Sequence, residues 1–196
     1  MASEKAYQGF RWMNEPASWS AASGLLQFET AAESDFWNET HYGFTHDSGH
    51  LYFKEIEGPF TAQVRVRAEL ESLYDQAGLM VWIDSMRWVK FGVEMNDGRP
   101  YISVVVTDRH SDWSTGAFLG DVRSFWLRLT LSAGVMRAQV SYDGVHWPLV
   151  RLAPFQDASI LRVGPMACSP KRGGLKVFFS AISISPPNGK GLHDLS

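Results

Sequence analysis

The sequence has few of the features that define several common protein classes. It contains one cysteine, so no disulfide can form within the chain. No apolar run approaches the ~20 residues that cross a bilayer, and the first twenty residues hold no signal-peptide core. The 18 basic residues are outnumbered by 21 acidic ones, whereas nucleic-acid binders carry a basic surplus. We therefore expect a cytoplasmic protein with no membrane and no nucleic-acid partner.

Motifs for common cofactors and nucleophiles are also missing. The chain has no glycine-rich dinucleotide or phosphate loop and no Gly-x-Ser-x-Gly turn, so we predict no cofactor. Cys168 lies in an apolar, proline-flanked stretch without an adjacent histidine, which predicts a buried structural thiol. His41, His46 and His50 surround Asp47 at spacings that match no metal motif, which favours a loop with surface histidines and no metal.

Aromatic residues and glycine are abundant, with 8 Trp, 12 Phe, 6 Tyr and 17 Gly, which favours short strands. Residues 62–70 alternate strictly between apolar and polar, as in a strand with one wet face. Similar alternation occurs at 76–82, 88–95, 101–107, 125–131, 136–142 and 175–182. Asp-Gly pairs at 97–98 and 143–144 predict hairpin turns. We predict an all-β, two-sheet antiparallel β-sandwich in one domain over residues 1–185, with a flexible tail over 186–196.

The alternation also predicts how the central strands pair. Keeping the apolar residues of 76–82, 88–95 and 101–107 in the core leaves one register, since a slip of one residue would bury charges. That register sets Gln76 opposite Glu94, Gly78 opposite Gly92, Met80 opposite Lys90 and Trp82 opposite Trp88; it also sets Tyr101 beside Glu94, Ser103 beside Gly92 and Thr107 beside Trp88.

The face opposite the core mixes aromatic, hydroxyl and charged groups. Its paired glycines predict a shallow floor, as found where a ligand or another backbone approaches a sheet closely. Trp88 and Trp37 would stack on a sugar ring, with polar contacts from Gln76, Lys90, Glu94, Asp75 and His41. The alternative is that Trp82 and Trp88 form a stabilising cross-strand pair and the charges only face solvent.

The segment 111–114 supports two interpretations. Its serines and Asp112 are typical of a turn that bonds its own backbone. Alternatively, Asp112 and Trp113 could close the end of the groove over a ligand.

Several blocks resemble a known family. They are Asp35-Phe36-Trp37, Thr40-His41-Tyr42-Gly43-Phe44, Tyr74-Asp75-Gln76-Ala77-Gly78-Leu79-Met80, Trp88-Val89-Lys90, Ser111-Asp112-Trp113-Ser114 and Val163-Gly164-Pro165-Met166. Over about residues 10–183 the chain resembles the domain-of-unknown-function family whose fungal member is named for regulation of enolase. The resemblance implies a concanavalin A-like lectin/glucanase jelly roll, a fold shared by lectins and glycosidases.

Glycosidases of this fold carry Glu-x-Asp followed closely by a second glutamate. The segment 33–39 is similar, but its last glutamate lies four residues after the aspartate, so the match fails. In an extended strand Glu33, Asp35, Trp37 and Glu39 would still share one face.

These observations predict a protein that binds a carbohydrate or a sugar-like metabolite in a concave-face groove without cleaving it. One alternative is a regulatory protein that binds a protein partner, and another is a glycoside hydrolase. The candidate ligand-binding residues are Trp37, His41, Tyr42, Asp75, Gln76, Trp88, Lys90, Glu94, Asp112 and Trp113. No catalytic or metal-binding residue is assigned.

Overall fold

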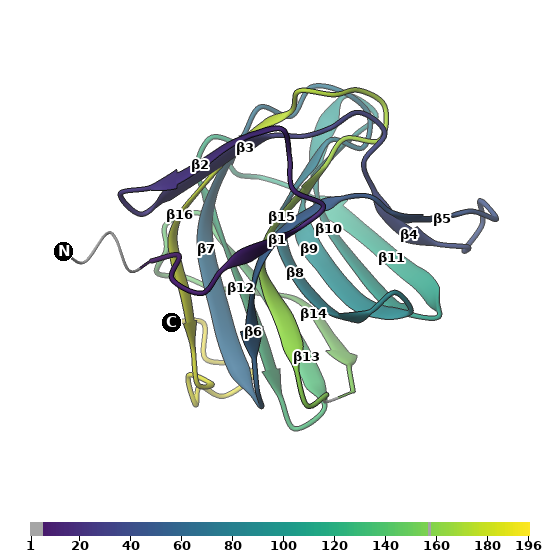
Figure 1. The fold of residues 1–196 in the computed structure, drawn as a ribbon. Coiled ribbons are helices and arrows are strands. Elements are labelled where there is room, and N and C mark those ends of the chain that lie inside the picture. Colours follow the sequence, from purple (N-terminus) through teal and green to yellow (C-terminus); the bar gives the residue numbers. More distant parts are fainter. Residues whose placement is uncertain (1–5, 157) are drawn as a thin grey trace.

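A computed structural model of the protein describes residues 6–156 and 158–196. Two seven-stranded antiparallel sheets pack face to face (Figure 1). Sheet A runs in the order β1 (Arg11–Met13), β6 (His50–Ile56), β15 (Leu161–Cys168), β8 (Gln76–Asp84), β9 (Arg87–Asn96), β10 (Arg99–Asp108) and β11 (His110–Ala117). Sheet B runs β14 (Leu149–Pro154), β13 (Val135–Ser141), β12 (Phe125–Ser132), β7 (Phe60–Ala68), β16 (Lys176–Ser185), β3 (Leu25–Glu29) and β2 (Ser18–Ala22). A separate hairpin joins β4 (Phe36–Asn38) to β5 (Thr45–Asp47). The predicted β-sandwich is confirmed.

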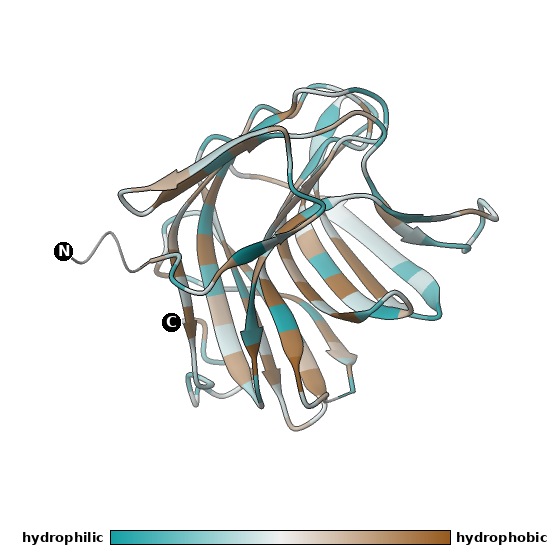
Figure 2. Ribbon diagram, viewed as in Figure 1, coloured by the Kyte–Doolittle hydropathy of each residue, from teal (hydrophilic) through white to brown (hydrophobic). Residues whose placement is uncertain are grey.

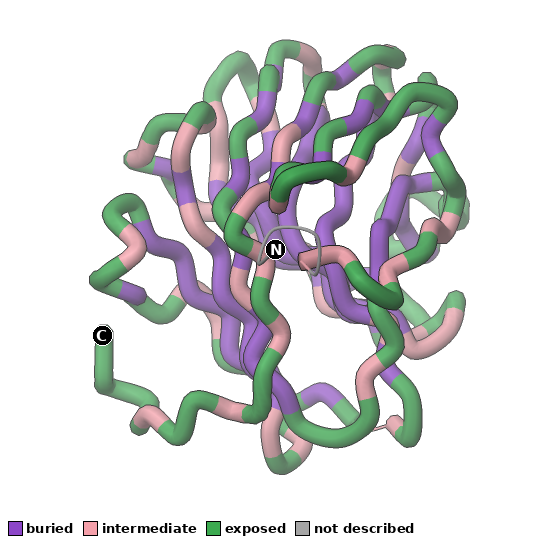
Figure 3. The backbone as a smooth tube through the Cα atoms, turned by 60° about the vertical axis from the view of Figure 1, so that its left-hand side comes forward, coloured by how far each residue is buried: buried purple, intermediate pink, exposed green. Residues whose placement is uncertain are grey.

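Alternating side chains build the core between the sheets. The inward residues of β9, Val89, Phe91 and Val93, are fully buried, as are Phe125 and Leu127 of β12. Figure 2 shows the resulting hydropathy bands along the strands, and Figure 3 shows how burial concentrates between the two layers. Burying apolar surface at about 25 cal/mol per Å² is the main force that holds the two sheets together.

The predicted register of the central strands is confirmed at every pair. Strand β8 sets Gln76 opposite Glu94 and Trp82 opposite Trp88, and β10 sets its residues against β9 as expected. The paired glycines, Gly78 and Gly92, are explained by the close approach of the neighbouring backbone. A Cβ on Gly78 would lie 2.0 Å from the carbonyl oxygen of Phe91 in the neighbouring strand. Glycine is therefore required for the close approach of two strands, without any ligand.

A segment that contains the β4–β5 hairpin covers part of the outer face of sheet A, the face away from the core. Phe36 is fully buried there, with its ring centroid 5.6 Å from Trp82 and 6.2 Å from Trp88. Asn38 ties β4 to the sheet, because its backbone N–H donates to Ser111 Oγ at 2.9 Å. The hairpin projects beside β11 (Figure 1). One half of the outer face is thus packed with apolar residues, and the other half stays open.

The interpretation of residues 111–114 as a turn is wrong. They belong to β11, which pairs with β10 through Thr107–Ser111 and Val105–Trp113. The reversal occurs earlier, at Arg109, whose φ of 65° turns the chain within one residue. Thr107 and Ser111 then share a side-chain hydrogen bond of 3.0 Å, so the hydroxyls that suggested a turn bond across two strands.

The segment predicted as a flexible tail lies against the outer face of sheet B. The Arg137 guanidinium donates to the carbonyl oxygens of Lys190 and Gly191, at 3.2 and 3.1 Å. The Trp147 backbone N–H donates to the Leu195 carbonyl at 2.7 Å. These contacts are on the side of the molecule opposite the open face of sheet A.

Candidate functional site

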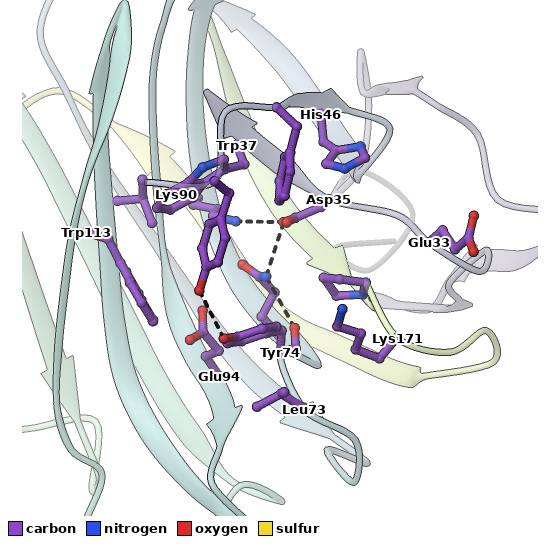
Figure 4. A pocket seen from close by; sticks show the side chains of 15 residues that line it. Glu33, Asp35, Trp37, His46, Leu73, Tyr74, Lys90, Glu94, Trp113 and Lys171 are labelled. Carbon is purple, nitrogen blue, oxygen red and sulfur yellow. Dashed lines mark hydrogen bonds and ion pairs between the residues drawn. The ribbon is translucent and has the colours of Figure 1, made fainter. Parts of the chain in front are cut away.

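A cavity of about 450 Å³ opens on the outer face of sheet A, between the β4–β5 hairpin and strands β8 to β11 (Figure 4). Strands β8, β9, β10 and β11 provide the floor, and the hairpin and the loop before β8 provide the walls. The lining residues are Glu33, Asp35, Trp37, Tyr42, Phe44, His46, Leu73, Tyr74, Gln76, Lys90, Glu94, Val105, Trp113, Pro170 and Lys171. Aromatic side chains form much of this wall, and charged groups lie at its base.

The structure brings six of the ten predicted site residues to this cavity. They are Trp37, Tyr42, Gln76, Lys90, Glu94 and Trp113. Gln76, Lys90 and Glu94 share the outer face because they alternate with core residues on paired strands. Trp37 and Tyr42 come from the β4–β5 hairpin, which no periodicity predicted.

Trp88 does not line the cavity, which corrects its predicted role as a stacking platform. It is 1% exposed, and its ring lies parallel to that of Trp82 with centroids 6.4 Å apart. Phe36 packs over both indoles. The alternative of a stabilising cross-strand pair therefore describes Trp88.

Asp75, Asp112 and His41 also lie away from the cavity. Asp75 is fully buried and accepts hydrogen bonds from the Arg172 guanidinium and from the backbone N–H groups of residues 71 and 72. Asp112 binds Arg151 at 2.6 Å, because neighbours on a strand face opposite sides and only Trp113 can point into the cavity. His41 is exposed near the tip of the hairpin, with a φ of 66°.

Asp35 is the principal residue that the sequence reasoning did not place in the site. Its Oδ1 accepts hydrogen bonds from Lys90 Nζ at 2.9 Å and from Gln76 Nε2 at 3.4 Å. Burial alone would lower the pKa of Lys90, but the charge of Asp35 raises it above its usual value. The sequence did contain a pattern that could have placed Asp35 in the site. Glu33, Asp35 and Trp37 were expected to share a face of an extended strand, and all three line the cavity. Glu39 leaves that face, because its φ of 50° breaks the extended alternation.

Glu94 is a strongly perturbed carboxyl group of the cavity. Burial raises its pKa to about 7, and the charge of Asp35 acts in the same direction. Lys90 and a hydrogen bond from Ser103 Oγ to Oε2, at 3.3 Å, lower it in part. The other carboxylate oxygen, Oε1, has no hydrogen-bond partner among the described residues. A buried carboxyl group with a free oxygen and a pKa near neutrality is typical of functional sites.

Hydrogen bonds fix the orientation of the two indoles. The Trp113 Nε1–H donates to Ser103 Oγ at 3.1 Å, and the Trp37 Nε1–H donates to the Thr40 carbonyl at 3.1 Å. Tyr42 and Tyr74 approach through their hydroxyl oxygens, 3.4 Å apart. The polar edges of these rings therefore have protein partners, and the rings contribute apolar surface to the cavity lining.

Cys168 and His50, the other reactive side chains considered in the sequence, are buried and have structural roles. Cys168 is fully buried, as predicted, and burial raises the pKa of its thiol well above the usual value. His50 is buried rather than on the surface, and its Nε2 accepts from the Ala31 backbone N–H at 2.8 Å. Within residues 6–156 and 158–196, no three His, Cys, Asp or Glu side chains gather as a metal site. Over the same residues, no helix is long and apolar enough to cross a membrane.

Comparison with solved structures supports the fold. A crystal structure of a functionally unknown protein from Saccharomyces cerevisiae matches with a TM-score of 0.91 and 52% identity, over 93% of this chain and 99% of that one. The GH43 protein BlXynB of Bacillus licheniformis matches with a TM-score of 0.68 and 17% identity, over 91% of this chain but 37% of that one. A legume lectin-like domain from Entamoeba histolytica matches with a TM-score of 0.61 and 10% identity, over 94% and 93%. The lectin/glucanase-type sandwich is confirmed.

Sequence comparison identifies the family. The chain is 55% identical over 185 residues to "Regulation of enolase protein 1" of Saccharomyces cerevisiae, which covers 94% of this chain and 93% of that protein. The family model described as "protein of unknown function (DUF1349)" matches residues 12–187. The resemblance seen in the sequence is confirmed, and the chain belongs to the DUF1349 family.

Proposed function

We propose that the protein binds a carbohydrate or a sugar-like metabolite in the cavity on the outer face of sheet A and does not cleave it. The observation that carries this proposal is the combination of flat aromatic faces and buried polar groups in one cavity. Sugar rings present an apolar face that stacks on aromatic side chains and hydroxyls that need polar partners at the edge. The proposal places this binding in the cytoplasm, where Cys168 stays reduced.

The side chains that would bond to ligand hydroxyls are already ordered on one side of the cavity. Lys90 and Gln76 both donate to the Asp35 carboxylate, so the three side chains hold their orientation before a ligand binds. Preorganised groups bind a ligand with less loss of conformational entropy than mobile ones. Lys171 and Glu33 line the cavity on the other side and could contact the more distant hydroxyls of a larger ligand.

The experiment is a thermal-shift screen of the purified protein against mono- and oligosaccharides and sugar phosphates. A ligand that binds the native state raises the free energy of unfolding by about 2.7 kcal/mol at one hundred times Kd, and the melting temperature rises with it. Trp113→Leu removes one aromatic face, while Trp19→Leu is a matched control on β2, outside the cavity. We expect a hit whose shift is lost in Trp113→Leu and kept in Trp19→Leu. A shift that survives Trp113→Leu would contradict the proposed location.

A second candidate function is regulation through a protein partner. It is favoured by the name of the yeast relative, which refers to regulation of enolase, and by the exposed aromatics of the hairpin, Tyr42 at 47% and Phe44 at 42%. Exposed aromatic side chains that cluster on one element are typical of protein interfaces.

This second function is tested with purified enolase. Enolase turnover is measured with and without an excess of the protein, together with direct binding by sedimentation velocity. A change in turnover that is lost in Phe44→Ser would support regulation by direct contact. Unchanged turnover and independent sedimentation of the two proteins would refute it.

Hydrolysis of a glycosidic bond is the third alternative, and the same cavity allows a direct test. Its carboxyl groups include the buried Glu94 and the partly buried Asp35, and the raised pKa of Glu94 is a property of general acids. Binding without cleavage predicts no turnover of aryl glycosides. Turnover that disappears in Glu94→Gln would replace the binding proposal with a hydrolase.

A further inference from the structure

Four aromatic side chains of the cavity form a closed ring, here called the aromatic box: Trp37, Tyr42, Tyr74 and Trp113. Trp37 lies edge-to-face against Tyr42 at 6.0 Å and against Trp113 at 6.2 Å between ring centroids. Trp113 lies edge-to-face against Tyr74 at 6.4 Å. The hydroxyl contact of Tyr42 and Tyr74 closes the fourth side. The sequence brings these rings from three separate segments to one point.

The box has the dimensions of a cation-binding site. Three of its sides measure 6.0, 6.2 and 6.4 Å between ring centroids, and a cation–π interaction reaches ~6 Å from a ring centroid. Near-perpendicular neighbours let several π faces point to one space, unlike a flat stacking platform. The indole N–H groups are already bonded to Ser103 and to the Thr40 carbonyl, so the box presents few donors to a sugar hydroxyl.

The charges around the box favour a positive ligand. Lys90 forms an ion pair with Asp35, and Lys171 and Glu33 contribute one charge of each sign on the other side of the cavity. The carboxyl group of Glu94 is therefore the charge in excess beside the box. Glu94 is 3% exposed and lies between Trp113 and Tyr74 at the edge of the box (Figure 4). Its Oε1 lacks a partner among the described residues. A buried carboxylate beside an aromatic box attracts a cation through a medium of low polarity.

We propose that the aromatic box binds a methylated or quaternary ammonium group of a small hydroxylated metabolite. This inference rests on the proposed ligand-binding function of the cavity and names the group that the box accepts. The ammonium group occupies the box, and the hydroxyl part of the same ligand reaches Asp35, Gln76 and Lys90. A methylated ammonium is suited to the box because it is bulky, weakly hydrated and needs no hydrogen-bond acceptor.

The experiment compares choline with 3,3-dimethylbutanol, its uncharged carbon counterpart, by isothermal titration calorimetry at pH 8. Both have the same shape, so the difference in affinity measures the charge. We expect choline to bind at least about tenfold tighter, which corresponds to about 1.4 kcal/mol. Equal affinity for both compounds, or no saturable choline binding up to about 10 mM, would overturn the inference.

Two variants locate the binding. Trp113→Leu and Tyr74→Leu each remove one wall, and each is expected to weaken choline binding about tenfold. Trp19→Leu on β2 is the aromatic control, and it should bind choline as the parent does. If Trp113→Leu fails to fold, Tyr74→Leu decides the question, since Tyr74 lies in a loop outside the strands. Undiminished binding in Tyr74→Leu would overturn the assignment to the box.

The role of Glu94 is tested by pH. The charged and titratable groups around it are Lys90 on the same strand, Asp35 from the segment before β4, Tyr74 from the loop before β8 and the thiol of Cys168 on β15. Burial raises the pKa of the Cys168 thiol well above its usual value, so it stays neutral at these pH values. Tyr74 has a pKa raised to about 12, so it stays neutral at the pH values used. Choline should bind about fivefold tighter at pH 8 than at pH 5.5 because Glu94 ionises between them. Glu94→Gln should abolish that dependence, whereas Glu57→Gln, at an exposed position, should keep it.

The two proposals fail in distinguishable ways. Binding of neutral sugars in the cavity without binding of choline would overturn the inference and leave the proposed function in place. Saturable binding of choline without any sugar ligand would support the aromatic box and refute the carbohydrate class.

Discussion

Replacing Glu94 by glutamine should change how the stability of the protein depends on pH. Burial raises the pKa of Glu94 from its ordinary value of 4.5 to about 7. Between these values the native state holds a proton that the unfolded state has released, so the free energy of unfolding falls as pH rises through this window. Each pKa unit corresponds to about 1.4 kcal/mol, which gives a loss of about 3 kcal/mol for the full window. The glutamine side chain of the Glu94→Gln variant does not titrate, so its free energy of unfolding should not fall in this way.

The assay is urea unfolding of both proteins at a series of pH values from 4 to 8.5. The stability of Glu94→Gln relative to the parent should rise by about 3 kcal/mol between pH 4.5 and pH 7.5. Burial lowers the pKa of His50, which makes stability rise with pH below about 6.5, but this contribution is common to both proteins and cancels in the difference. A difference that stays constant across this range would refute the burial argument for Glu94.

Further predictions concern the residues around the cavity. Asp35→Ala should destabilise the protein by about 3–5 kcal/mol in urea unfolding, because it leaves Lys90 buried without its partner; Glu33→Ala, at an exposed position, should change stability by less than about 0.5 kcal/mol. Gly49→Ala should lower the melting temperature by a measurable amount, since the added methyl group would lie 2.3 Å from a buried phenylalanine ring and cost about 1–3 kcal/mol. Cys168 should not react with a thiol reagent in the native protein and should react in urea, because its thiol is buried and protonated; rapid native labelling would contradict the packing described.

The sequence allowed good prediction where local periodicity sets the structure. The alternation of β8, β9 and β10 predicted their register at each pair, because a one-residue slip would place charged side chains in the core. Gln76, Lys90 and Glu94 were found for the same reason. The edge strands β1, β2 and β14 are short or weakly alternating, so no period marked them.

The walls of the cavity depend on contacts between distant segments, which no local pattern shows. The apolar–polar alternation of its strand put Trp88 on the outer face, where it was expected to be exposed. Phe36 from another segment covers it there. Asp35 and Tyr74 reach the cavity from loops, and Tyr74 has a left-handed backbone with a φ of 66°. Sequence distance separates Trp37 from Trp113, so the aromatic box could be recognised only in three dimensions.

The central claim is that a small ligand binds in the cavity on the outer face of sheet A. The most direct test follows the indole N–H signals of the protein by two-dimensional NMR while choline or a sugar found in the thermal-shift screen is added. We expect the Trp37 and Trp113 signals to move with a common saturation curve, while those of Trp126 on β12 and Trp147 in the loop after β13, both on the sheet B side, stay in place. Signals that stay in place throughout the titration, or that move only on sheet B, would contradict the claim.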